Sequence, residues 1–418
     1  MTVRADLVVR DLAEAATLAT GPIPRSGAAM SELGRIPDAA LAADAGRIVW
    51  VGRERDLARA VRRRPGARTV AGNGGTLLPG FVDAHTHLLF AGDRAAELPW
   101  KAAGASYAEI ARRGGGIAST VRATRRASDE ELVRAALGRL RRMAAWGTTS
   151  LEVKSGYALS HAGELRLLRL VPRLAARSGL RLVPTYLGAH AVPPELDGRA
   201  GPYVDRIVRA TLPEVARRGL ARFCDVFCEP GFFSVGEADR ILRRARSLGL
   251  GLKLHADEFV RSGGARLAAR LGATSAEHLL ATTAGDRERL ARAGVIAVLL
   301  PLTAASAAPP RQSPARELVD AGAPVALGTD CSPNTWVEGM PGVLAAAVHT
   351  GRLSPAEAVT AATVNAAAAI GLSDAGTLRP GAPADFSVFP IPSADRLGYR
   401  FDVRPTVVYR QGKPISPP

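Results

Sequence analysis

Short apolar stretches alternate with longer segments of helical periodicity through the middle of the chain. Each stretch is bounded by turn residues and is short enough to be a strand. The predicted strands are Leu77–Val82, Thr148–Val153, Arg181–Leu187, Phe223–Phe227, Gly251–Leu254, Thr274–Glu277, Val295–Leu300 and Val325–Gly328. Strands that alternate with helices are typical of βα units and a parallel sheet. Eight such units fit a closed (β/α)8 barrel.

The segments between these strands carry signals for helix starts. A serine followed three residues later by a glutamate has the spacing of a capping box, in which each side chain bonds the other residue's backbone N–H. This spacing occurs at Ser128 and Glu131, at Ser234 and Glu237, and at Ser354 and Glu357. After Ser128, the residues Leu132, Ala136, Leu140 and Met143 form one apolar stripe, and Gly147 ends the helix.

The two ends of the chain follow a different pattern. Short β-like pieces at Ala5–Val9 and Arg47–Val51 are separated by a Gly-, Pro- and Ala-rich stretch over residues 21–44. Near the other end, Asp385–Phe389 and Thr406–Arg410 are again short strands joined by turns. We expect the two ends to complete one small sheet domain.

Composition places the chain among globular proteins with a large core. Of its 418 residues, 47% are hydrophobic and 22% are charged. The net charge of +16 comes almost wholly from scattered arginines, because lysine occurs only at positions 101, 154, 253 and 413. No aromatic-interleaved basic repeat accompanies them, so we expect no nucleic-acid partner, although the positive field would attract a small anionic substrate.

Cysteine usage and the absence of targeting segments point to the cytoplasm. The cysteines Cys224, Cys228 and Cys331 form no CxxC pair and no disulfide framework, which suits a reducing compartment. The N-terminus has no basic segment followed by an apolar region, and no apolar run reaches the length of a membrane span. We therefore expect a cytoplasmic protein without a membrane partner.

Candidate chemistry begins with the pair His85 and His87, which follows the first predicted strand. Because strand side chains alternate faces, the two imidazoles point the same way and can share a cation such as zinc or iron. The ends of later strands carry His255, His278 and Asp330. Since the C-terminal strand ends of a barrel converge on its active site, we expect these residues to meet there.

This set of strand-end residues resembles the pattern of the amidohydrolase superfamily. The resemblance implies an α/β fold with a (β/α)8 TIM-like barrel and a small β-sandwich domain built from both chain ends. The implied domains are residues 1–75 and 378–418 for the sandwich and residues 76–377 for the barrel. Some members bridge two metals with a modified lysine on the fourth strand, but here that strand, Phe223–Glu229, has no lysine. One divalent or trivalent metal ion, zinc or iron, is therefore expected.

Within that superfamily the chain is similar to the imidazolonepropionase family, from about Leu77 to Asp385. The segments that carry the similarity are His85–Arg94, Gly114–Ile117, Glu152–Tyr157, Leu187–Pro193, Asp225–Glu229 and His255–Glu258. The resemblance implies metal ligation by His85, His87, His255 and Asp330. It also implies substrate contacts from Arg94, Tyr107, Tyr157, His190 and Glu258.

One loop departs from the family's pattern. After the eighth-strand aspartate the family commonly has Asn-Pro-Gly-Ser, whereas this chain has Cys331-Ser332-Pro333-Asn334-Thr335. Ser332 and Asn334 therefore stand where an Asn and a Gly would be expected to meet the substrate. We predict that Ser332, Asn334 and Thr335 contact the substrate.

The reaction implied by the resemblance is hydrolysis of the lactam C–N bond of 4-imidazolone-5-propanoate, giving N-formimidoyl-L-glutamate in histidine degradation. A bound ion would lower the pKa of its water toward ~7, which makes a metal-bound hydroxide available, and would polarise the carbonyl. Asp330 and His278 are assigned to orienting that water and taking its proton. Glu258 is assigned to protonating the departing ring nitrogen. The division of work among these three catalytic residues stays open.

Two alternatives use the same residues differently. An aminohydrolase (deaminase) acting on a nucleobase-like ring would have similar ligands but would release ammonia. A catalytically silent relative acting as a scaffold would be expected to have lost ligands, and here all are present. The sequence allows a homodimer without fixing the assembly state.

Overall fold

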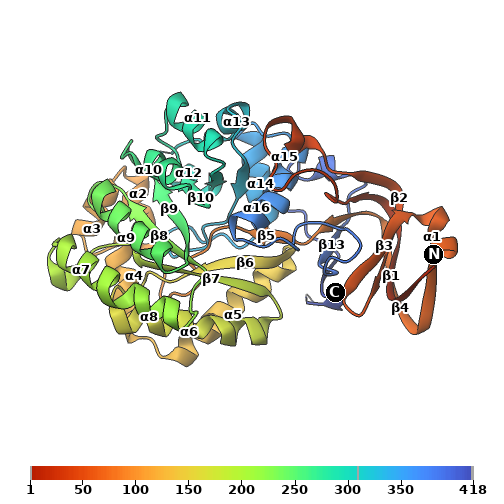
Figure 1. Ribbon diagram of the computed structural model, residues 1–418, viewed down its shortest axis with the longest axis horizontal. Helices are drawn as coiled ribbons and strands as arrows, with labels where there is room; N and C mark the ends of the chain where they lie inside the picture. Colours follow the sequence, from red (N-terminus) through yellow and green to blue (C-terminus); the bar gives the residue numbers. More distant parts are fainter. Residues whose placement is uncertain (1, 308–309, 416–418) are drawn as a thin grey trace.

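The protein divides into a large barrel and a smaller sheet. The computed structural model describes residues 2–307 and 310–415 of the chain. The barrel with its covering helices lies at one end of the long axis, and the smaller sheet lies at the other (Figure 1). Helices α2 and α3 lie at the end of the barrel that is far from the smaller sheet (Figure 1).

The barrel contains eight parallel strands among the described residues, in the order in which they follow one another along the chain. They are β5 (Phe81–Asp83), β6 (Thr148–Lys154), β7 (Arg181–Ala189), β8 (Phe223–Cys228), β9 (Gly251–Ala256), β10 (Ser275–His278), β11 (Ile296–Leu299) and β12 (Val325–Leu327). Residues just beyond β5 and β12 close the ring, since Asp330 N donates to His85 O across 3.0 Å and Thr86 pairs with Cys331. The predicted barrel is confirmed.

The first predicted strand, Leu77–Val82, is two strands of different sheets. β4 (Val61–Pro79) belongs to the smaller sheet, where Leu78 pairs with Ser387, and β5 begins only at Phe81. Gly80 makes the crossing possible because a Cβ at this position would lie 2.2 Å from Thr149 Cγ2. The apolar pattern could not reveal the break, because residues 77–79 at the end of β4 and all of β5 are buried.

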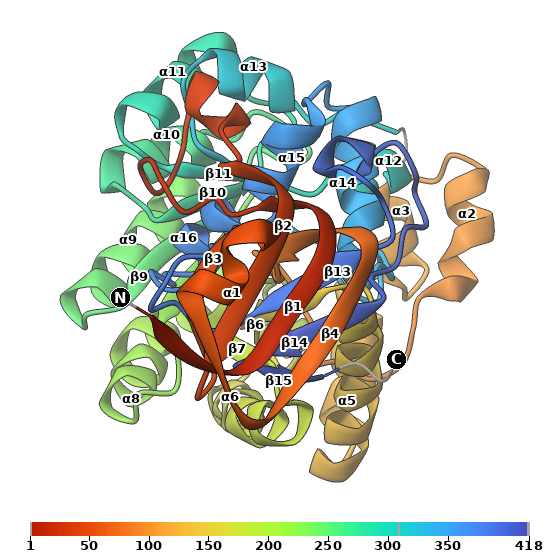
Figure 2. The same cartoon turned by 90° about the vertical axis from the view of Figure 1, so that its right-hand side faces the viewer.

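The smaller sheet draws its strands from both chain ends, as predicted. Within the described residues its order is β15-β14-β13-β4-β1-β2-β3, and Figure 2 looks onto β1 and β4 side by side across its centre. Its strands besides β4 are β1 (Val3–Ala16), β2 (Arg35–Asp44), β3 (Arg47–Arg53), β13 (Phe386–Phe389), β14 (Val407–Arg410) and β15 (Lys413–Pro414). The domain limits at residues 75 and 377 stay a prediction.

The sequence interpretation of residues 21–44 as a stretch between strands is wrong in part, because Arg35–Asp44 forms strand β2. Its residues Ala39–Ala43 are buried between β1 and β3, which supply their backbone partners. Small residues such as alanine carry little intrinsic strand preference, so the pairing with neighbouring strands decides the conformation.

Helices cover the barrel between its strands. The α-helices are α1 (Leu57–Ala60), α2 (Leu98–Ala102), α3 (Tyr107–Arg112), α4 (Gly116–Arg126), α5 (Asp129–Ala145), α6 (His161–Ser178), α7 (Ala200–Arg206), α8 (Leu212–Arg217), α9 (Val235–Ser247), α10 (Gly264–Leu271), α11 (Ala284–Arg292), α12 (Pro301–Ser306), α13 (Ala315–Asp320), α14 (Met340–His349), α15 (Pro355–Ala361) and α16 (Val364–Ala369). The 3-10 helices are η1 (Gly27–Ser31), η2 (Glu54–Asp56), η3 (Ala95–Glu97), η4 (Pro194–Leu196) and η6 (Ala394–Arg396), and η5 (Ile207–Thr211) is a π-helix.

The predicted helix starts are confirmed at α5, α9 and α15, where Ser128, Ser234 and Ser354 form capping boxes. The apolar stripe of α5 is buried, with Leu132 and Leu140 both fully inaccessible. Burying a leucine side chain contributes about 1.5–3 kcal/mol, so this stripe fastens the helix to the barrel. The described helices include none with the length and apolar character of a membrane span.

Candidate metal centre and active site

Four histidines and an aspartate come together at one end of the barrel. His85 and His87 follow β5, His255 lies on β9, His278 ends β10, and Asp330 follows β12. All five side chains are buried. The predicted convergence of strand ends is therefore confirmed for these residues.

Three of the histidines point one ring nitrogen at a common point. His85 Nε2 and His87 Nε2 lie 3.1 Å apart, and His255 Nε2 lies 3.3 Å from His87 Nε2. Asp330 Oδ1 lies 3.4 Å from the first of these nitrogens and 3.5 Å from the second. Ligands of a tetrahedral zinc ion bound at about 2.0–2.1 Å lie about 3.3 Å from one another, so the spacing fits one metal ion.

In two of these rings the other nitrogen, Nδ1, contacts a carboxylate. His85 Nδ1 contacts Glu277 Oε2, and His255 Nδ1 lies 2.9 Å from Asp225 Oδ2. A proton held on Nδ1 leaves Nε2 as a lone-pair donor, which is the form that binds a metal. Carboxylates in this position orient the ring and raise its basicity as a ligand.

A buried ionic network lies directly behind the histidines. Lys154 Nζ is 2.8 Å from Glu152 Oε2, 2.7 Å from Asp225 Oδ2 and 2.8 Å from Glu277 Oε2. Lys253 Nζ is 2.8 Å from Glu152 Oε1 and 3.0 Å from Glu277 Oε1. These five side chains have an exposed fraction of 0%.

This network determines the charge of Glu277 and Asp225, the carboxylates that contact His85 and His255. Burial favours the neutral form of Glu277, but the charges of Lys154 and Lys253 outweigh burial and hold its pKa well below the usual range. The pKa of Asp225 is also lowered, because His255 and Lys154 outweigh burial there. Both carboxylates are therefore ionised and can accept the histidine protons.

Sequence reasoning missed this network, although a signal was present. Glu152 and Lys154 alternate on β6, and Lys253 precedes His255 by two residues on β9, so each pair shares a strand face. Charged residues inside otherwise apolar strands of a parallel sheet need buried partners. The pattern therefore predicts an ionic network, but it does not say which residues pair.

The backbone is strained where two strands, β10 and β12, reach the site. His278 has φ of 68°, Leu279 has φ of 62° and Asp330 has φ of 52°. Side-chain-bearing residues rarely adopt this left-handed region, and each such position costs on the order of 1–3 kcal/mol. The strain turns the chain at these strand ends, where His278 and Asp330 line the pocket.

A cavity of about 750 Å³ opens above the histidines. Its walls combine apolar rings such as Phe227, Phe232 and Phe259 with a few polar side chains. The predicted substrate contacts that line it are Arg94, Tyr157, His190, Glu258, Ser332 and Asn334. A mostly apolar pocket with few converging polar groups is typical of a small-molecule site.

Glu258 lies beside His278 at the edge of this cavity. Its Oε1 is 3.6 Å from His278 Nδ1. Burial raises the pKa of Glu258 well above its usual range, and the charges of Asp330 and Glu229 add to this. Burial also lowers the pKa of His278 to about 3, with His255 as a further cause. These shifts favour a protonated carboxyl on Glu258 and a neutral imidazole on His278.

Arg94 is paired inside the protein. Its Nε lies 2.9 Å from each carboxylate oxygen of Glu97, and its Nη2 lies 2.7 Å from Oε2. Glu97 Oε1 also accepts a hydrogen bond of 2.7 Å from Gly116 N. Arg94 still lines the cavity, but the charge of Glu97 offsets its own.

The other predicted contacts have different surroundings. The His190 ring stacks on His87, with centroids 4.9 Å apart, and its Nδ1 lies 3.1 Å from Gly156 O. Tyr157 packs against both rings, at centroid distances of 5.7 Å from His87 and 5.2 Å from His190. These contacts place both side chains beside His87, one of the predicted metal ligands.

Two predicted contacts, Thr335 and Tyr107, are not among the described residues that line the cavity. Thr335 lies behind Ser332, where Thr335 N donates to Ser332 Oγ across 3.2 Å and Thr335 Oγ1 lies 3.3 Å from Ser306 Oγ. The side chain of Tyr107 lies outside the described part of the chain, although its backbone begins α3. Both substrate-contact roles stay predictions.

Two cations of the cavity were not predicted from the sequence. Lys101 on α2 and Arg311 both line it. Lys101 Nζ donates to Asn334 Oδ1 across 2.7 Å, and Arg311 Nη1 donates to Glu258 O across 3.1 Å. Both come from segments remote from the strand ends, and the sequence offers no local sign that they face the site.

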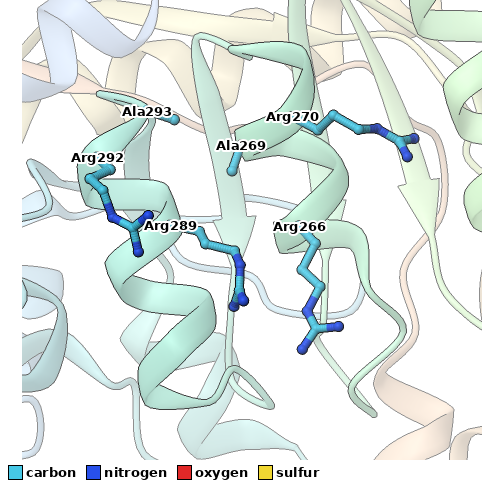
Figure 3. Close-up of a pocket in the computed structure, with 6 residues that line it drawn as sticks. All are labelled: Arg266, Ala269, Arg270, Arg289, Arg292 and Ala293. Carbon is cyan, nitrogen blue, oxygen red and sulfur yellow. The ribbon is translucent and has the colours of Figure 1, made fainter.

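A second hollow, of about 460 Å³, lies between α10 and α11 (Figure 3). The described residues that line it are Arg266, Ala269, Arg270, Arg289, Arg292 and Ala293. None of these is a histidine or a carboxylate, so the barrel cavity is the candidate active site.

Comparisons with known proteins agree with this geometry. The model of the amidohydrolase family matches residues 76–415. An imidazolonepropionase of Symbiobacterium thermophilum is 49% identical over 94% of this chain and 93% of its own length. An imidazolonepropionase of Solibacter usitatus is 46% identical over 95% of each chain.

Solved structures resemble the fold at lower identity. An adenosine deaminase from Xanthomonas campestris with bound zinc is similar with a TM-score of 0.71 and 22% identity, over 99% of this chain and 93% of that one. An atrazine chlorohydrolase from Arthrobacter aurescens complexed with zinc is similar with a TM-score of 0.70 and 19% identity, over 98% and 95% of the two chains. These similarities support the fold alone.

Proposed function

Because this chain belongs to the amidohydrolase family and its curated relatives are imidazolonepropionases, we propose that it hydrolyses the lactam C–N bond of 4-imidazolone-5-propanoate. The oxygen of water adds to the ring carbonyl carbon, the C–N bond breaks and the ring nitrogen takes a proton. The product is N-formimidoyl-L-glutamate, as formed in histidine degradation.

The observation that carries this proposal is the convergence of three imidazoles and one carboxylate beneath the cavity. The donor atoms of His85, His255 and Asp330 each lie 3.1–3.5 Å from His87 Nε2, Asp330 Oδ1 lies 3.4 Å from His85 Nε2, and Glu258 stands at the rim of the same cavity. A cation-binding set and a protonated acid facing one pocket are the two parts that hydrolysis of an amide ring requires.

We assign the metal ligands as His85, His87, His255 and Asp330, which offer three nitrogens and one oxygen to zinc or iron. Such an ion acts as a Lewis acid that lowers the pKa of water and polarises a carbonyl. The buried lysines support a single ion, because Lys154 already neutralises the carboxylates behind the ligands. A second cation would have to displace this ammonium.

The proton transfers are assigned to residues of the chain itself. Asp330 Oδ2 accepts a hydrogen bond of 2.9 Å from Thr303 Oγ1, which fixes the carboxylate. His85 and other histidines outweigh burial and lower the pKa of Asp330, so this ionised group can take a proton from the attacking water. His278, as a neutral imidazole, orients that water by hydrogen bonding. Glu258, whose raised pKa favours the protonated carboxyl, supplies the proton to the departing ring nitrogen.

Product identification tests the proposal. Purified protein loaded with zinc or with iron is incubated with imidazolonepropanoate, and the products are identified by mass spectrometry alongside an ammonia assay. We expect N-formimidoyl-L-glutamate without stoichiometric ammonia. Ammonia release would favour the aminohydrolase alternative, and no turnover with either metal would favour a silent scaffold.

The predictions on cellular location and binding partners are part of this proposal. We propose a cytoplasmic enzyme with a small anionic substrate and no nucleic-acid or membrane partner. The cysteines Cys224, Cys228 and Cys331 are all buried and free, which supports a reducing compartment. A homodimer stays a prediction.

A further inference from the structure

We propose that Glu229 is a positioning residue for the proton donor Glu258. Glu229 follows β8 and Glu258 follows β9, so the two residues lie at the ends of neighbouring parallel strands. This assignment rests on the proposed function and deepens it, because it names a group behind the cavity that holds the proposed acid in place. Glu229 itself is not among the described residues that line the cavity.

The carboxylate of Glu229 binds the backbone of the segment that carries Glu258. Its Oε1 accepts a hydrogen bond from Glu258 N and another, across 3.2 Å, from Phe259 N. Glu229 is only 1% exposed, so water does not compete for these contacts. Because hydrogen bonds are directional, they fix where the backbone of Glu258 lies.

The carbonyl group of Glu258 is held from a different element. Arg311 Nη1 donates to Glu258 O across 3.1 Å, and the backbone N of Arg311 donates to Ala304 O of α12 across 2.9 Å. Both backbone polar groups of Glu258 are thus bound, its N–H by Glu229 and its C=O by Arg311. From this fixed backbone its Oε1 reaches to 3.6 Å from His278 Nδ1.

The rest of the segment after β9 is held by other groups. Asp257 Oδ1 accepts hydrogen bonds of 2.7 Å from Ser262 N and 2.9 Å from Gly263 N. Ser262 Oγ lies 2.8 Å from the same oxygen and 2.9 Å from Cys228 O at the end of β8. Loss of the Glu229 carboxylate would therefore leave these contacts in place and would free the backbone of Glu258 in particular.

The charge of Glu229 also favours the acid form of Glu258. Burial is the largest cause of the raised pKa of Glu258, and the negative charges of Asp330 and Glu229 add to it. The titratable and charged groups that face Glu258 are Asp330, Glu229, His278, His85 and Arg311. Burial raises the pKa of Glu229 itself to about 7, so its negative form prevails above that pH. A negative neighbour helps a proton donor to keep its proton until the ring nitrogen departs.

Turnover and metal content test the positioning role. In Glu229→Ala the N–H groups of Glu258 and Phe259 lose their acceptor. We expect kcat for 4-imidazolone-5-propanoate to fall about 10-fold or more, the scale of a small misplacement of a reacting group. KM and bound metal should change little. Glu237→Ala is the matched control, because Glu237 also accepts a backbone N–H, from Ser234 across 2.9 Å, but at the exposed start of α9.

Glu229→Gln separates the hydrogen bonds from the charge. Its amide oxygen can still accept from the backbone N–H of Glu258, so kcat at the optimal pH should recover much of the wild-type value. The amide carries no negative charge, and this lowers the pKa of Glu258. The basic limb of the pH profile should therefore move to lower pH, which a merely structural role would not cause. This variant keeps the shape of the side chain and tests the proposal even where Glu229→Ala fails to fold.

A double variant tests whether Glu229 acts through Glu258. Glu258→Gln already lacks the proton donor, so adding Glu229→Ala to it should lower kcat by less than about twofold. The two losses would then be far from additive, as expected for residues that act as a unit.

The outcomes distinguish this assignment from the proposed function. Equal losses of kcat from Glu229→Ala in the wild-type and Glu258→Gln backgrounds would overturn the assignment alone, and so would loss of the bound metal in Glu229→Ala. Wild-type turnover in Glu229→Ala, or an unshifted basic limb in Glu229→Gln, would also overturn it. A wild-type protein that forms no N-formimidoyl-L-glutamate overturns the proposed function, and the assignment falls with it.

Discussion

Replacing Lys154 by methionine should destabilise the barrel and weaken metal binding together. The Lys154 ammonium contacts three carboxylates at 2.7–2.8 Å, and all four side chains have an exposed fraction of 0%. Without it, Glu152 and Glu277 would keep Lys253 as their lysine counter-charge, and Asp225 would keep only its contact with His255 among the described ion pairs. Methionine has a similar length but cannot neutralise them.

The expected magnitude follows from these distances. At 2.8 Å and an effective dielectric constant of about 20, each contact corresponds to about 6 kcal/mol of Coulomb energy. Desolvation of the ions offsets most of this sum, and breaking a buried pair by removing one partner costs about 3–5 kcal/mol. Since folded domains are stable by only about 5–15 kcal/mol, Lys154→Met should lower the free energy of unfolding by a large fraction.

The metal site should respond because the same carboxylates hold its ligands. Glu277 contacts His85 Nδ1 and Asp225 contacts His255 Nδ1, so their rearrangement turns both imidazoles. Loss of such supporting contacts typically costs about 10- to 100-fold in metal affinity. We therefore expect Lys154→Met to release its metal to a competing chelator at a concentration at which wild type retains it.

Urea unfolding followed by circular dichroism measures the stability, and chelator competition measures the affinity. The double variant Lys154→Met with Glu152→Gln removes one charge of each sign, and it should recover part of the loss as a coupling energy of about 0.5–3 kcal/mol. Lys413→Met is the control for the same substitution at an exposed site. A Lys154→Met protein within about 1 kcal/mol of wild type, with unchanged metal affinity, would refute this reasoning.

Three further predictions concern the reaction and the metal. His85→Ala should lose bound metal by elemental analysis and lose activity with it; full metal content together with full activity would exclude His85 as a ligand. Glu258→Gln should keep the metal but turn over about 100-fold more slowly, because an amide cannot supply the proton. The raised pKa of Glu258 means that wild-type activity should fall as the pH rises through that pKa, and a basic limb that survives in Glu258→Gln would assign it to another group. Dialysis against a chelator should abolish activity and lower the unfolding temperature, since an ion that binds only the folded state stabilises it, and both should return with zinc or iron.

The amino-acid sequence by itself determined the barrel and the metal-ligand candidates. Strands recur as short apolar runs, and helices begin at capping boxes such as Ser128 with Glu131, so both are encoded by nearby residues. His85 and His87 share a face because strand side chains alternate, and this needs no knowledge of the rest of the chain. Local periodicity was therefore enough to predict which residues gather at the strand ends.

Only the tertiary structure decided which polar groups become partners. Lys154 meets Asp225, 71 residues away, and Lys101 meets Asn334, 233 residues away. It also decided that the chain changes sheets at Gly80, within one unbroken apolar run. The physical reason is the same in each case. Hydrophobic periodicity specifies which side chains are buried, whereas barrel closure and strand register specify which buried charges and backbone groups meet.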